Sequence, residues 1–80
     1  GKQVEEHIFR SVFNEVRRLV AGASLSKELA HQRMAMFISA AVVSVKRAYP
    51  TFNPGESFWA DLCSDVYETC VECLYEEMWN

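Results

Sequence analysis

The side chains best suited to chemistry are three cysteines, Cys63, Cys70 and Cys73, and two histidines, His7 and His31. The Cys70-x-x-Cys73 spacing occurs in zinc sites and in redox-active pairs. A zinc site needs about four ligands, and its cysteine pairs usually lie in tight turns. Redox pairs lie at a helix N-terminus, where the thiol pKa is lowered. This pair falls inside an expected helix, so we interpret the thiols as packing groups and predict no metal and no cofactor.

No other arrangement of side chains predicts catalysis. The sequence contains no Ser-His-Asp or Cys-His grouping and no glycine-rich phosphate loop, and it has only three glycines. Both histidines are expected at surface or boundary positions. We therefore predict that the protein is not an enzyme.

The number and spacing of the cysteines also indicate a compartment. Three cysteines cannot all pair, and all three lie within one short segment, whereas disulfide frameworks tie distant segments together. The pattern favours a reducing, intracellular compartment and leaves cytoplasm and nucleus as alternatives.

The elements that must position these side chains are three predicted helices. Apolar residues recur every three or four positions in segment 3–21, and Gly22 is expected to end this helix. Segment 27–49 contains neither Gly nor Pro and precedes Pro50. In segment 54–79, Asn53 resembles an N-cap and Pro54 suits the first helical position.

The most apolar stretch, 34–45, has twelve residues without a charge. It is too short to cross a bilayer, which needs roughly 20 apolar residues. We place it in the middle helix of a single all-α domain, a three-helix antiparallel bundle with helices at about 3–21, 27–49 and 54–79. The 80 residues fit one domain over 1–80, which we expect to be part of a larger protein because the chain begins with Gly1.

Charge is divided unevenly along the chain. Residues 1–50 have a balance of +4, whereas residues 51–80 have seven carboxylates, no base and a balance of −7. Five of these carboxylates share one face of the predicted helix 54–79. This face is either simply solvated or a docking face for a basic partner. For the second hypothesis we select Asp65, Glu68 and Glu72.

Two apolar features could contact a partner directly. Met36 and Val43 lie seven residues apart, on the side of segment 27–49 opposite its expected core face. They are either covered by loops and neighbouring helices or exposed to a partner helix or a second copy. Tyr75 and Trp79 near the C-terminus are the residue types enriched at interface hot spots. The alternative for Trp79 is packing back onto the bundle.

Together these features predict a non-enzymatic protein–protein interaction module. We expect it to dock a helix or basic peptide of another protein on exposed apolar and aromatic surface, with the acidic face of helix 54–79 steering the encounter. A homo-oligomerisation domain is the alternative. A nucleic-acid-binding domain is less well supported, because recognition helices expose basic and amide residues and carboxylates repel phosphates. No membrane partner is expected.

Overall fold

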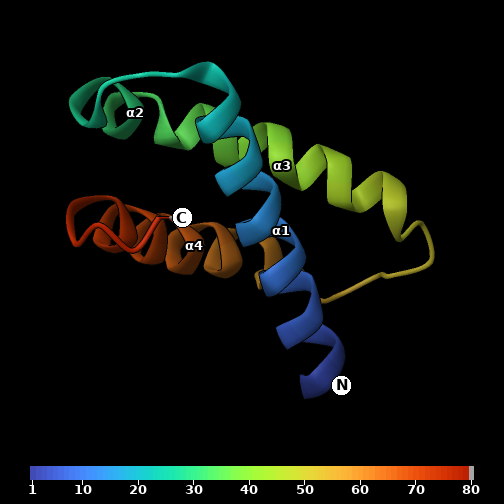
Figure 1. Ribbon diagram of the computed structural model, residues 1–80. Helices are drawn as coiled ribbons and strands as arrows, with labels where there is room; N and C mark the ends of the chain where they lie inside the picture. The colour runs from blue at the N-terminus through green and yellow to red at the C-terminus, as the bar shows by residue number, and fades with distance from the viewer. Residues whose placement is uncertain (80) are drawn as a thin grey trace.

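The computed structural model describes residues 1–79 and shows four helices (Figure 1). They are α1 (Lys2–Ala23), α2 (Lys27–Gln32), α3 (Met34–Ala48) and α4 (Phe58–Tyr75). No strand occurs within the described range, so the predicted all-α class is confirmed. Within residues 1–79, no helix combines the length and the apolar character that crossing a membrane requires.

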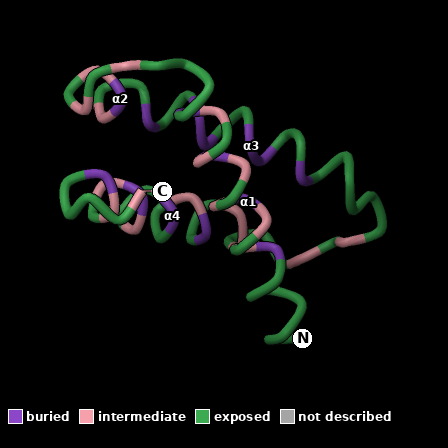
Figure 2. Tube along the Cα trace, viewed as in Figure 1, coloured by how far each residue is buried: buried purple, intermediate pink, exposed green. Residues whose placement is uncertain are grey.

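A single apolar core joins the helices. Figure 2 shows buried positions recurring along α1, α3 and α4. In α1 and α4 every fourth residue is buried, and this spacing keeps the side chains on one helical face. The core consists of Ile8, Val12, Val16 and Val20 of α1, Ala30 of α2, Met34, Phe37, Ile38, Ala41, Val42 and Val45 of α3, and Leu62, Val66, Cys70 and Leu74 of α4.

The predicted three-helix antiparallel bundle is not confirmed. The structure has a fourth helix, and α1 runs steeply across α3 and α4, with its N-terminal turns extending beyond them (Figure 1). Each of these three helices contacts the other two, and α2 packs against α3 and α4. The arrangement leaves the outer faces of α3 and α4 in solvent.

The extra helix arises because segment 27–49 is not continuous. Arg33 has φ −98° and ψ 7°, which separates α2 from α3, and its backbone N–H bonds to carbonyls of α2. The sequence does not indicate this break, because segment 27–49 contains neither Gly nor Pro. Aromatic contacts explain the direction of α2: the His31 ring lies 5.4 Å from that of Tyr75 and 6.2 Å from that of Tyr67, both on α4.

Helix α1 extends two residues past the predicted end at 21. Gly22 lies inside the helix, and the left-handed residue that ends it is Ser24, with φ 54°. The left-handed conformation is unfavourable for a non-glycine residue such as Ser24. Gly22, in contrast, lowers the stability of the helix and does not form the turn that ends it. Ser26 then caps α2 by accepting a hydrogen bond from the backbone N–H of Leu29.

Helix α4 is shorter at both ends than the predicted 54–79. It begins after Ser57, so Asn53 and Pro54 lie in the connection and do not cap it. The ring of Phe52 contacts Phe58 and Trp59 edge-to-face, at 5.3 and 5.9 Å between centroids, which folds the connection back onto the first turn of α4.

The C-terminal end of α4 is a left-handed turn. Glu77 has φ 60°, and the backbone N–H of Met78 bonds to the carbonyl of Cys73 at 3.0 Å. This is the hydrogen bond of a Schellman motif, which satisfies a helix-terminal carbonyl and reverses the chain. The reversal directs residues 78 and 79 back toward α1.

Candidate protein-docking surfaces

The three cysteines occupy different environments on α4. Cys70 is fully buried, whereas Cys63 and Cys73 are half-buried, and all three are free thiols. Burial raises the pKa of the Cys70 thiol to about 12, and burial also raises the pKa of Cys63. A nucleophilic or metal-binding cysteine needs the opposite shift. Within residues 1–79, no three His, Cys, Asp or Glu side chains are grouped as metal ligands.

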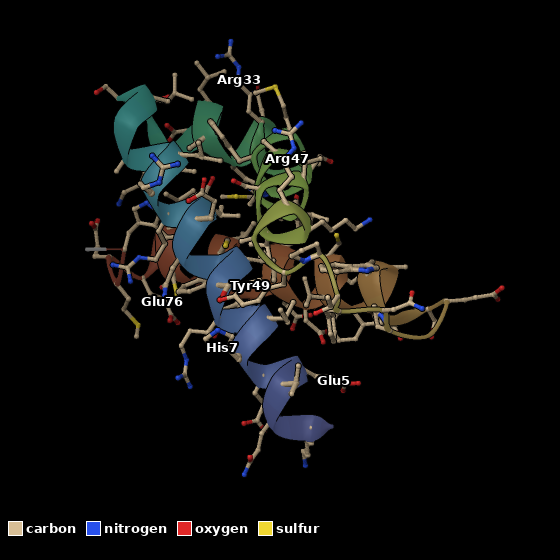
Figure 3. All side chains as sticks on the ribbon, turned by 90° about the vertical axis from the view of Figure 1, so that its right-hand side faces the viewer. Glu5, His7, Arg33, Arg47, Tyr49 and Glu76 are labelled. Carbon is tan, nitrogen blue, oxygen red and sulfur yellow. The ribbon has the colours of Figure 1, made fainter. Side chains whose placement is uncertain are left out.

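Each histidine contacts a tyrosine from a distant segment. The Nε2 atom of His7 lies 2.8 Å from the hydroxyl oxygen of Tyr49, and the Nδ1 atom of His31 lies 3.0 Å from that of Tyr75. Figure 3 shows His7 and Tyr49 side by side. The contacts tie α1 to the end of α3, and α2 to α4. We interpret both histidines as structural.

An open groove of about 790 Å³ runs between α1 and α4. We call it the α1/α4 groove. Its apolar wall is made by Phe9 and Phe13 of α1 and by Phe58 and Leu62 of α4. The three phenylalanines are only half-buried, so the fold leaves aromatic surface in contact with solvent. Clefts of this size and apolar character are typical of binding sites.

Charged residues surround this apolar wall. Glu5, Glu6, Asp61 and Asp65 carry four negative charges, against the two positive charges of Lys2 and Arg10. The excess is therefore negative. Figure 3 shows Glu5 on the protruding N-terminal turns of α1. The groove is suited to a ligand that is apolar on one side and positively charged.

The three carboxylates selected from the sequence lie on the exposed side of α4. Asp65, Glu68 and Glu72 are all exposed, and Asp65 also lines the α1/α4 groove. Their spacings of three and four residues place them in one row. The row begins at the groove with Asp61 and Asp65 and continues along α4 through Glu68 and Glu72.

The two C-terminal aromatic residues are not equivalent. Tyr75 is 47% exposed while its hydroxyl group contacts His31. Trp79 packs back onto α1, edge-to-face against Phe13 at 6.3 Å between centroids, and its carbonyl accepts hydrogen bonds from Arg17. Its indole N–H is buried and has no hydrogen-bond partner within the described residues. Trp79 therefore packs back onto the other helices in this structure, which is the alternative to its role as an exposed anchor.

Met36 and Val43 lie on the outer face of α3, 58% and 49% exposed. Loops and neighbouring helices therefore leave about half of each side chain exposed. Because α3 and α4 pack together through their buried residues, this apolar face and the acidic row lie on the outer sides of two different helices. The structure does not join them into one surface.

The α1/α4 groove was not found from the sequence. Its signal is the width of the apolar sector of α1, in which Phe9 and Phe13 each follow a core residue, Ile8 and Val12. Such pairs occupy more of the helix circumference than one neighbour covers. Which part of the sector stays open depends on how α4 crosses α1.

Comparison of the chain with models of known families, with curated proteins and with solved structures finds no match.

Proposed function

We propose that the protein is a non-enzymatic interaction module that binds an amphipathic, positively charged helix of another protein in the α1/α4 groove. The observation that carries this proposal is the half-buried aromatic wall of Phe9, Phe13 and Phe58 beneath a predominantly acidic rim. Burying this wall would remove apolar surface from water, the main favourable contribution to association.

The shape of the groove supports a helix as the ligand. Two helices with an open space between them provide a surface into which a third helix can place side chains at positions i, i+3, i+4 and i+7. An enclosed pocket would favour a small molecule, whereas this groove is open to solvent. The partner would make a helix–helix interface of the kind that already joins α1 to α3.

The charge of the groove supports a basic partner. Asp61 and Asp65 stand at the groove, and Glu68 and Glu72 extend the negative field along α4. Exposed charges of this kind contribute more to the association rate than to affinity. Bringing cations near the row would also relieve the repulsion among carboxylates spaced one turn apart.

The test uses a synthetic peptide of about 18 residues with leucines at i, i+3, i+4 and i+7 and lysines elsewhere. Binding is measured by fluorescence anisotropy. Phe9→Ala should weaken binding about tenfold, because Phe9 belongs to the groove wall. Leu19→Ala, a truncation of another half-buried residue of α1 outside the groove, is the matched control and should leave binding unchanged.

The role of the acidic rim is tested separately. Asp61→Lys with Asp65→Lys should slow association and flatten its dependence on salt, whereas Glu28→Lys on α2 should not. Failure of the lysine peptide to bind, or equal binding by Phe9→Ala and the unchanged protein, would reject the groove as the site. Light scattering distinguishes the alternative: a dimer that Phe9→Ala dissociates would indicate a homo-oligomerisation domain.

A further inference from the structure

We infer that α3 carries a second docking surface, which binds an amphipathic helix with carboxylates at both ends of its apolar stripe. The surface, here called the α3 strip, consists of Arg33, Met36, Ala40, Val43 and Arg47. It lies outside the α1/α4 groove and prefers the opposite charge. It therefore goes beyond the proposed function.

Four residues of the α3 strip lie on one face of α3, and Arg33 is the N-cap at the beginning of that helix. The residues of the strip are separated by three, four, three and four positions, the spacing that keeps side chains on one side of a helix. All five are exposed. At 1.5 Å per residue, the distance along the axis from Arg33 to Arg47 is about 20 Å, which corresponds to roughly four turns of a partner helix.

The middle of the α3 strip is apolar surface that the fold does not use. Residues on the opposite face of α3, including Phe37, Ile38 and Val45, form the core. Met36 and Val43 are about half exposed, with Ala40 between them. Methionine adapts to different partner side chains, and the small alanine lets another helix approach closely.

The charges at the two ends identify the partner. Arg33 and Arg47 form no ion pair within residues 1–79, so both guanidinium groups are available to a partner. Figure 3 shows both arginine side chains projecting outward on the same side of the molecule. A guanidinium group binds a carboxylate through two parallel hydrogen bonds, so acidic groups complement both ends.

The same charges argue against a second copy of α3 as the occupant. In a parallel pair of α3 helices, each arginine would face its own counterpart, and in an antiparallel pair Arg33 would face Arg47. Both arrangements place like charges together at both ends of the contact, which is unfavourable. A partner with carboxylates at those positions meets no such penalty.

The test uses two synthetic helical peptides of about 18 residues with the same leucine and alanine stripe. The acidic peptide carries glutamates near both ends, and the basic peptide carries lysines there. Binding of each to the full chain is followed by fluorescence anisotropy. Arg33→Glu with Arg47→Glu should weaken binding of the acidic peptide about tenfold or more. It should not weaken binding of the basic peptide, because the new glutamates attract its lysines.

Two further variants separate contact from net charge. Arg18→Glu with Lys27→Glu makes the same change in net charge away from the strip and should have a much smaller effect on the acidic peptide. Met36→Ser with Val43→Ser replaces the apolar centre of the strip and should also weaken binding of the acidic peptide. Both positions are exposed, so the core is not changed. Circular dichroism confirms that each variant is folded.

Each remaining outcome overturns the inference. One such outcome is that the acidic peptide fails to bind. A second is that it binds equally well to the Arg33→Glu/Arg47→Glu variant and to the Arg18→Glu/Lys27→Glu control. A third is that light scattering reveals a dimer that Met36→Ser with Val43→Ser dissociates. The last result would assign the strip to a second copy. Because the basic peptide and Phe9→Ala report on the α1/α4 groove, failure of one surface is distinguishable from failure of the other.

Discussion

The guanidinium group of Arg17 donates two hydrogen bonds to the backbone carbonyl oxygen of Trp79, from Nε at 3.2 Å and from Nη2 at 3.0 Å. The same group lies 5.8 Å from the centre of the Phe13 ring, which contacts the Trp79 side chain. One arginine of α1 thus holds the chain that follows α4. Together these contacts hold Trp79 against α1, and its side chain does not project as an anchor.

Replacing Arg17 by Met should loosen the C-terminal segment. Arg17→Met keeps the apolar stem and removes the donors, so we expect the free energy of unfolding in urea to fall by about 1 kcal/mol. In a Trp59→Phe background, the emission of Trp79 should shift to longer wavelength as the indole meets water. Arg18→Met, on the exposed side of α1, should leave this emission unchanged, and an unshifted spectrum for Arg17→Met would contradict the assignment.

Trp79 should tolerate a change to phenylalanine better than a change to alanine. Trp79→Phe retains a ring against Phe13 and removes an indole N–H that is buried without a partner. An unsatisfied buried donor is destabilising by about 1–3 kcal/mol, so its removal offsets the loss of the larger ring. We therefore expect the unfolding free energy of Trp79→Phe to lie within about 1 kcal/mol of that of the unchanged protein. Trp79→Ala should lower the unfolding free energy by about 2 kcal/mol. Equal losses for both variants in chemical denaturation would show that the N–H is satisfied in solution.

Gly22→Ala should stabilise the protein. Gly22 lies within α1, and apart from its chain neighbours and the nearby backbone of the same helix, no atom comes within 4 Å of the position that an added Cβ would occupy. Alanine is favoured over glycine in a helix, and the expected gain is about 0.5–1 kcal/mol in unfolding free energy. Gly55→Ala, in a connection where the added Cβ also meets nothing, is the control for effects on the unfolded chain. A lower melting temperature for Gly22→Ala would mean that α1 ends earlier in solution.

Cys70 should make stability depend on pH in alkaline solution. Its pKa is raised to about 12 from an ordinary value of 9.0, so the folded state keeps the thiol proton after the unfolded chain has lost it. The stabilisation is complete below pH 9 and is lost progressively as pH rises toward 12. Cys70→Ala lacks this dependence. The stability advantage of the unchanged protein over Cys70→Ala should therefore shrink over this range in denaturation experiments.

Thiol labelling provides an independent check on Cys70. At pH 8, iodoacetamide should modify the half-buried Cys63 and Cys73 before the fully buried Cys70, as determined by mass spectrometry of peptides. In denaturant all three should react at similar rates. Rapid labelling of Cys70 in the folded protein would contradict its burial.

The helices themselves could be predicted because the pattern that defines them is local. Apolar spacing alone identifies the sectors of α1 and α4 that contain the core positions, from Ile8 to Val20 and from Leu62 to Leu74, but not which member of each apolar pair is buried. A helical projection also places Met36 and Val43 opposite Phe37 and Ile38, but it left open whether loops or other helices cover them, and the structure shows both exposed. Charge at Asp65, Glu68 and Glu72 is visible in the sequence for the same reason.

Helix ends and docking surfaces depended instead on contacts between distant residues. The break at Arg33 accompanies the contact of His31 with Tyr75, and α4 starts late where Phe52 folds onto Phe58. Local signals at Gly22 and Asn53 predicted helix ends that the structure does not have. Capping preferences are worth only about 1 kcal/mol, so packing between distant residues outweighs them.

The sequence by itself therefore determined that the chain is helical, which sectors of its helices are apolar and where its charges lie, because each of these follows from residue type and helical periodicity. Only the tertiary structure decided that Trp79 is packed away, that Phe9, Phe13 and Phe58 border one groove, and that Arg33 and Arg47 flank an exposed strip. These relationships depend on how α1 crosses α4 and on where the chain bends. Both are set by packing between residues that are far apart in the sequence.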